Sequence, residues 1–173
     1  GIEDVNGKFL EAAVLEFTTG LIVWPGDTNR DGDVNVFDIL PVGQFWGLAG
    51  EIRRKGNSSW RLQPAISWPN KQATYADANG DGIINLDDVF TINDNWKKTI
   101  EDGITSPAPD SPIQSQFSHP EMLEIYEKMY FGLQIRSRET GVNSELAVAL
   151  KKIIEQLRMQ SLPTVSYTHL TLP

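Results

Sequence analysis

Two stretches of this chain space oxygen-bearing side chains at the intervals needed to enclose a hard metal cation. They begin at Asp27 and Asp77, 50 residues apart, and each places such side chains at positions 1, 3, 5, 9 and 12 of a loop, with glycine at position 6. Calcium takes about six to eight oxygen ligands, and a loop of about 12 residues can supply them from these positions together with a backbone carbonyl at position 7. The spacing therefore predicts two calcium ions, one in each loop.

The candidate ligands follow from these loop positions. At position 7 only a backbone carbonyl is needed, so aspartate in one loop and isoleucine in the other are both acceptable. Gly32 and Gly82 at position 6 allow the left-handed conformation of a sharp turn. The predicted ligands are Asp27, Asn29, Asp31, Asp33, Asn35 and Asp38 in the first loop, and Asp77, Asn79, Asp81, Ile83, Asn85 and Asp88 in the second.

The alternative is that each loop is only a polar turn, because a single Asp-Gly pair most often marks a turn. Here the register continues beyond both loops, since apolar residues such as Val42 and Ile92 also lie 50 residues apart. We therefore predict two units, each a calcium loop followed by a helix. Val34 and Ile84, at position 8, are apolar in both copies, which predicts a short β-like contact between the two loops.

Other elements are expected around these units. Residues 9–23 mix β-branched and aromatic residues around a Thr-Thr-Gly turn, which predicts two short strands. Because an isolated hairpin is marginal in water, we expect residues 1–23 to be the end of an upstream β-rich domain and the chain to be a fragment. Residues 104–117 are rich in proline and serine and predict an extended linker.

A helical hairpin is predicted over residues 118–162. Ser118 and Glu121 form a capping-box pair at its start. Apolar residues then recur at helical spacing on both sides of a break at residues 140–143. Packing is the favoured role of these apolar faces, and a functional groove or an oligomerisation face is the alternative.

Composition excludes several functional classes. The net charge of -8 at pH 7 argues against nucleic-acid phosphates as partners. Zero cysteines exclude disulfides and thiolate chemistry, and no apolar run approaches the roughly 18 residues that a membrane helix needs. We therefore predict neither a nucleic-acid partner nor a membrane span.

Catalysis is not expected from this chain. Its histidines are His119, which opens a predicted helix, and His169, which lies among residues 166–173. Those residues resemble translated adapter sequence, so we expect the tail 163–173 to be non-native. The loop carboxylates are assigned to calcium, which leaves no general base. A glycoside hydrolase domain, if one belongs to this protein, would lie in a missing N-terminal part.

The two units resemble the dockerin type I family. Ordinary EF-hands place a helix before the loop and Glu at position 12, whereas Trp24-Pro25-Gly26 precedes the first loop here and Asp closes both loops. The resemblance covers about residues 24–103. It implies a mainly α module with the twelve ligands named above, on a secreted or cell-surface bacterial protein. It also implies calcium-dependent docking to a cohesin-like domain, often within a polysaccharide-degrading system.

The sequence departs from that family in three places. Loop positions 10 and 11 hold Val36-Phe37 and Leu86-Asp87, where well-studied members carry small hydroxyl residues that contact cohesin. An insertion over about residues 51–69 brings basic residues and two tryptophans. We expect the tryptophans to pack on the core, and the alternative is that this insertion contacts a sugar or a protein. Pro41 predicts that the first helix starts late or bends.

Two roles remain open from the sequence. The module either docks to a partner or acts as a calcium-stabilised spacer packed on the upstream β domain. Exposure of Val36, Phe37 and Leu86 favours docking, whereas burial of these residues against residues 9–23 favours the spacer.

Overall fold

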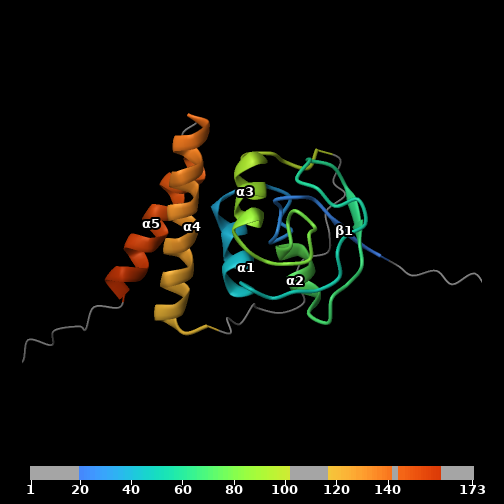
Figure 1. Cartoon of the computed structure of the whole chain (residues 1–173), viewed down its shortest axis with the longest axis horizontal. Coiled ribbons are helices and arrows are strands. Elements are labelled where there is room, and N and C mark those ends of the chain that lie inside the picture. Colours follow the sequence, from blue (N-terminus) through green and yellow to red (C-terminus); the bar gives the residue numbers. More distant parts are fainter. Residues whose placement is uncertain (1–19, 102–116, 142–143, 161–173) are drawn as a thin grey trace, which may run out of the picture.

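The computed structural model describes residues 20–101, 117–141 and 144–160, and its helices form two layers (Figure 1). The long helices α4 (His119–Thr140) and α5 (Glu145–Gln160) form a hairpin, and α4 lies between α5 and the helices of the two loop units. The remaining elements are β1 (Leu21–Val23), the 3-10 turn η1 (Val36–Asp38), α1 (Ile39–Gln44), β2 (Gln63–Ala65), α2 (Lys71–Ala76) and α3 (Leu86–Asp94). The described chain is mainly α, as predicted. None of its helices is long and apolar enough to cross a membrane.

Each predicted loop is followed by a helix, and the two helices begin differently. In the second unit α3 starts directly at Leu86. In the first unit a 3-10 turn precedes α1, which starts only at Ile39. Pro41 has no backbone N–H to donate to the residue four positions earlier, so the regular α ladder cannot begin there. The prediction of a late helix start is therefore confirmed.

The two units are joined through their loops, but the predicted contact between Val34 and Ile84 is wrong. Val34 N–H donates to the carbonyl of Lys98 at 2.8 Å, and Ile84 N–H donates to the carbonyl of Leu48 at 2.9 Å. Each loop thus pairs with the segment that follows the other unit's helix. That segment can return because the chain reverses just after each helix, at Gly47 (φ 79°) and at the equivalent Lys97 (φ 64°).

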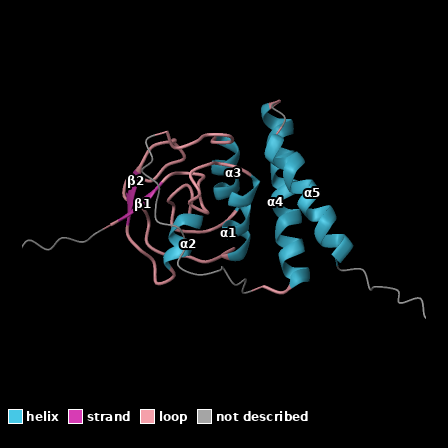
Figure 2. Cartoon of the chain, turned by 180° about the vertical axis from the view of Figure 1, so that it is seen from behind, coloured by secondary structure: helices cyan, strands magenta, loops and turns pink. Residues whose placement is uncertain are grey.

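The strand at residues 21–23 belongs to a small sheet on the side of the module away from the hairpin (Figure 2). It pairs antiparallel with β2, which lies in the insertion, and Leu21 faces Ala65 in the register. Val23 is fully buried there with Tyr75 of α2. Residues 9–19, the linker residues 104–116 and the tail 163–173 lie outside the described residues.

The insertion tryptophans pack back onto the module, as expected. Trp68 is buried, and its indole N–H donates to the Glu51 carbonyl at 3.0 Å. Its ring lies where a side chain on Gly50 would be, because an added Cβ would be 2.1 Å from it. Trp60 contacts Trp24 with ring centroids 4.9 Å apart.

The helical hairpin completes the main core. Its start is confirmed, because Ser118 N–H and the Glu121 carboxylate are 2.7 Å apart in a capping box. Helix α4 approaches α1 and α3 closely at two glycines: a Cβ on Gly43 would lie 2.7 Å from the ring of Tyr126, and a Cβ on Gly132 would lie 2.5 Å from Leu86. The hairpin therefore shares one core with the two loop units.

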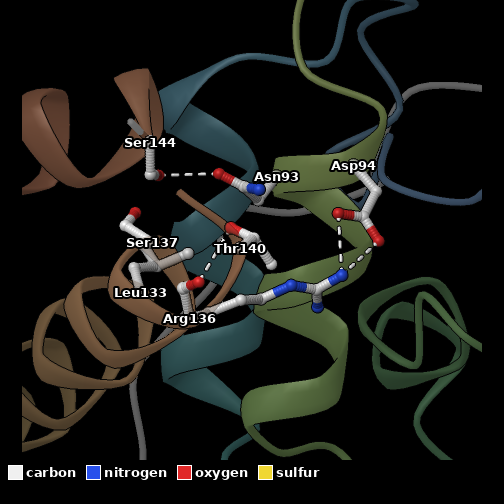
Figure 3. A pocket seen from close by; sticks show the side chains of 7 residues that line it. All are labelled: Asn93, Asp94, Leu133, Arg136, Ser137, Thr140 and Ser144. Carbon is white, nitrogen blue, oxygen red and sulfur yellow. Dashed lines mark hydrogen bonds and ion pairs between the residues drawn. The ribbon is translucent and has the colours of Figure 1, made fainter. Parts of the chain in front are cut away.

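Polar contacts lock the same interface around a pocket of about 170 Å³ (Figure 3). Arg136 of α4 reaches Asp94 with its Nη2 at 2.8 and 3.0 Å from the two carboxylate oxygens. Ser144 donates to the Asn93 side-chain oxygen at 2.7 Å. These pairs fix the end of α3 against the turn of the hairpin.

We expect Gly43→Ala to destabilise the fold, although alanine is the better helix former by about 1 kcal/mol. The buried ring of Tyr126 cannot yield easily, and overpacking typically costs about 1–3 kcal/mol. Urea unfolding measures the change. Lys128→Ala, on the exposed side of α4, is the control and should change stability by less than about 0.5 kcal/mol. Equal stability of Gly43→Ala and the unaltered chain would contradict this interface.

Candidate metal-binding loops

The two predicted loops share one local structure. Asp31 N–H donates to the Asn29 side-chain oxygen at 2.9 Å, and 50 residues later Asp81 N–H donates to Asn79 at 2.8 Å. The next turn repeats as well, because the N–H groups at position 7 donate to Asp31 and Asp81 at 2.9 Å. Burial follows the same order, residue by residue, along both loops. The turns are thus built by short polar side chains, each of which accepts a hydrogen bond from the backbone N–H two residues later in the chain.

Glycine at position 6 is required by the backbone. Gly32 has φ 94° and Gly82 has φ 89°, a region that side chains with a Cβ rarely adopt. Position 4 is also left-handed, with Arg30 at φ 67° in one loop and Gly80 at φ 82° in the other. Two successive reversals therefore curl each loop around its own centre.

The aspartates at position 12 are buried and hold the loop closed. Asp38 accepts hydrogen bonds from Asn29 N–H at 3.2 Å and Asn35 N–H at 2.8 Å, and Asp88 accepts the equivalent pair from Asn79 and Asn85 at 3.1 and 2.8 Å. Both side chains are fully buried. Loss of solvation raises the pKa of each carboxyl to about 8, although the backbone donors oppose the shift.

The aspartates at position 1 are buried too, but they differ in their partners. Asp27 has a buried side-chain oxygen, Oδ1, without a hydrogen-bond partner. Burial and the nearby charge of Asp31 raise its pKa to about 6, although the backbone N–H groups of Arg30, Gly32 and Asp31 oppose the shift. In the second loop both oxygens of Asp77 accept backbone hydrogen bonds, from Gly80 at 2.9 Å and Gly82 at 3.2 Å.

The other predicted ligands lie on the same loops with different exposure. Asn29, Asn35, Asn79 and Asn85 are half-buried, whereas Asp31, Asp33, Asp81 and Ile83 are exposed. The side chain of Asp33 is engaged by Thr99, whose hydroxyl donates to it at 2.7 Å. This bond leaves the Asp33 carboxylate outside the loop centre, which agrees with a role for its carbonyl at position 7.

The donors fit a hard cation in kind. Within the described residues, no three His, Cys, Asp or Glu side chains form a ready-made metal cluster. In each loop, burial is the main cause that raises the pKa of the carboxyl at position 12, and the charges at positions 1 and 5 raise it further. Side-chain amides partly compensate the negative charge at position 5, because Asn29 Nδ2 donates to Asp31 and Asn79 Nδ2 donates to Asp81, both at 2.9 Å. Oxygen donors, mutual repulsion and the orphaned oxygen of Asp27 all suit a divalent ion.

Sequence reasoning missed Arg53 and Thr28 at these loops. Arg53 is one of the basic residues of the insertion, for which only a sugar or protein contact was considered. It is 4% exposed, and its guanidinium donates to the carbonyls of Asp77 and Ala78. Thr28 closes the first loop through a hydroxyl bond to the Asp38 carbonyl. The sequence held one signal for Arg53. Position 4 is Arg30 in the first loop but Gly80 in the second, where a side chain would meet Arg53.

Comparison with family models identifies part of the chain. Residues 25–94 match the family model described as the dockerin type I domain. No curated protein and no solved structure matches the chain.

We expect the metal-free protein to become less stable as the pH rises from about 4 to about 8. The carboxyls of Asp38 and Asp88 have pKa values raised to about 8, so the folded state binds protons that the unfolded state has lost in this range. The melting temperature at pH 8 should be at least about 5 °C below that at pH 5, which corresponds to about 1–2 kcal/mol in a domain of this size.

Thermal unfolding followed by circular dichroism, after removal of divalent ions on a chelating resin, measures this difference. The matched control is the double variant Asp38→Asn and Asp88→Asn, in which the pH dependence should shrink to the smaller contribution of Asp27 and Asp77. A metal-free protein that is more stable at pH 8 than at pH 5 would contradict the burial of these carboxyls.

Proposed function

Because residues 25–94 form a dockerin type I domain, we propose that this chain is a calcium-dependent docking module that binds a cohesin-type domain of another protein. The observation that carries the proposal is the repetition of one loop structure 50 residues apart, with buried aspartates at positions 1 and 12 of both copies. Burying several carboxylates is costly unless a cation or hydrogen bonds compensate their charge.

Each loop would hold one calcium ion through the residues at positions 1, 3, 5, 7, 9 and 12. When bound, the ion supplies the positive charge that the buried carboxylates need. Asp27 and Asp77 come from the start of each loop, and Asp38 and Asp88 come from the start of each helix. Joining these two ends in one coordination shell would fix each helix against its loop. The helices would thereby be positioned for docking.

The first unit offers the better docking surface. Phe37 is 59% exposed, and Leu40, one turn further on, is 41% exposed. In the second unit the residue equivalent to Phe37 is the exposed Asp87, and the residue equivalent to Leu40 is Phe90, whose ring centre lies 4.5 Å from the Arg136 guanidinium. A partner would therefore meet an asymmetric module and bind it in one orientation.

A structural role is the second candidate, and the packing supports it. Val36 and Leu86 are half-buried against the main core, next to the helical hairpin. Residues 21–23 also join the module through β2. A calcium-stabilised spacer in a secreted surface protein would use such contacts to hold neighbouring parts of its own chain.

We propose a secreted or cell-surface location and no catalytic role for this chain. A polysaccharide-degrading system is the setting in which such modules are expected, and its catalysis would reside in another domain. His119, one of the two histidines, has its Nε2 3.0 Å from the Leu157 carbonyl in the described part of the hairpin. His119 is exposed at that position, on the surface of the hairpin.

Calcium should stabilise the chain strongly. We expect the melting temperature and the helical circular dichroism signal to rise when calcium is added to chelated protein, because each site contributes RT ln(1 + [L]/Kd), or about 2.7 kcal/mol at 100 times Kd. The double variant Asp31→Ala and Asp81→Ala is the control and should respond weakly. A spectrum and a melting temperature that ignore calcium would exclude the metal role of the loops.

Docking is tested with a panel of purified cohesin domains and isothermal titration calorimetry. We expect binding in calcium and none in chelator, and Phe37→Ala should weaken it by at least about tenfold, as is common for a central aromatic contact. Phe131→Ala is the matched control, since Phe131 is 64% exposed on α4. Calcium-stabilised protein that binds no cohesin in the panel would favour the spacer role.

A further inference from the structure

Arg53 is a buried cation that clamps the start of the second loop. Its side chain is 4% exposed, and its Nη2 donates to the carbonyls of Asp77 at 2.9 Å and Ala78 at 2.8 Å. Its backbone N–H also donates to the Gly80 carbonyl at 3.0 Å. One residue of the insertion therefore holds positions 1, 2 and 4 of the loop.

The guanidinium fills space that the first loop uses differently. A Cβ on Gly80 would lie 2.4 Å from Arg53 Nε, so position 4 must be glycine when Arg53 is in place. In the first loop position 4 is Arg30, whose guanidinium lies 4.4 Å from the centre of the Tyr75 ring. That loop is closed instead by the hydroxyl of Thr28, a position held by Ala78 in the second loop.

The charge of Arg53 is directed at the loop's carboxylates. Its Nε and Nη1 are buried without hydrogen-bond partners, so their charge is compensated through space. Burial lowers the pKa of Arg53, and the charges of Asp77 and Asp88 oppose that shift. Arg53 in turn opposes the rise that burial causes in the pKa of Asp77. In the first loop Asp27 keeps an orphaned oxygen.

We propose that Arg53 is a resident cation of the second loop, which keeps that loop folded without metal, whereas the first loop depends on a bound ion for its order. The part that concerns the ion rests on the proposed calcium binding. The part that concerns Arg53 does not, because it describes the metal-free protein. The two halves of the duplicated module thus have different tasks: one is a permanent framework, and the other responds to calcium.

Amide hydrogen exchange of the whole chain, followed by NMR in the presence of chelator, tests the proposal loop by loop. The equivalent N–H groups of Asn29 and Asn79, and of Asp33 and Ile83, report the two loops separately. We expect the second-loop amides to exchange at least about tenfold more slowly than their first-loop equivalents. Saturating calcium should then slow exchange mainly in the first loop.

Arg53→Met removes the charge and the two carbonyl bonds while keeping an unbranched side chain. In chelator its second-loop amides should exchange as fast as those of the first loop, while the core amides of Val89 and Ile92 stay protected. Arg53→Lys should have an intermediate effect, because it keeps the charge but not the paired bonds. Arg54→Met, at the exposed neighbouring position, is the control and should change neither loop.

Equal protection of the two loops in the unaltered chelated protein overturns the proposal, as does slow second-loop exchange that survives Arg53→Met. If Arg53→Met unfolds the whole chain, the comparison of the two loops in the unaltered protein and in Arg53→Lys decides the matter. Failure of calcium to slow exchange in any variant would contradict the proposed metal binding. The role of Arg53 in the metal-free loop would then be decided by the exchange rates measured in chelator alone.

Discussion

The structure depends on how it compensates four buried aspartates. Asp27, Asp38, Asp77 and Asp88 are each at most 3% exposed. Charged carboxylates lose solvation at such positions, and the loss must be offset by donors, by cations or by protonation. Much of the local architecture follows from this need. The curled loops direct backbone N–H groups at the carboxylates, and at the start of each helix the carboxylate at position 12 accepts hydrogen bonds from these N–H groups.

The apolar core is organised around the same constraint. The helices of the two units share one apolar face that needs cover. Helix α4 provides it by close approach at Gly43 and Gly132. The result is one continuous core that includes Met129 and Leu133 of the hairpin and Val42 and Ile92 of the two units. The polar pairs at the edge of this interface, such as Arg136 with Asp94, fix the orientation of the hairpin and add little to its stability.

Features encoded locally could be predicted from the sequence. The loops, the helix after each loop, the capping box at Ser118 and the late start caused by Pro41 all depend on residues within a few positions of one another. Features that depend on distant segments could not be predicted. The pairing of residues 21–23 with the insertion, and the return of each chain segment to the opposite loop, are set by packing between segments with no shared pattern. Position 8 is apolar because it enters the core, so apolarity there did not identify its hydrogen-bond partner.

Divergence between the two copies explains more than their similarity does. The duplicated loops keep the same residues at positions 1, 3, 5, 6, 9 and 12, and their differences at positions 2 and 4 each go with a different contact in the structure. Ala78 and Gly80 accompany the buried Arg53, whereas Thr28 closes the first loop without it. Phe37 is exposed on the first unit, while Leu86 and Phe90 of the second lie under the hairpin. The surface left open therefore lies on the unit that lacks the internal clamp. If this unit is the docking surface that we propose, an ion that orders it would also order that surface, and metal binding would be coupled to recognition through a single loop.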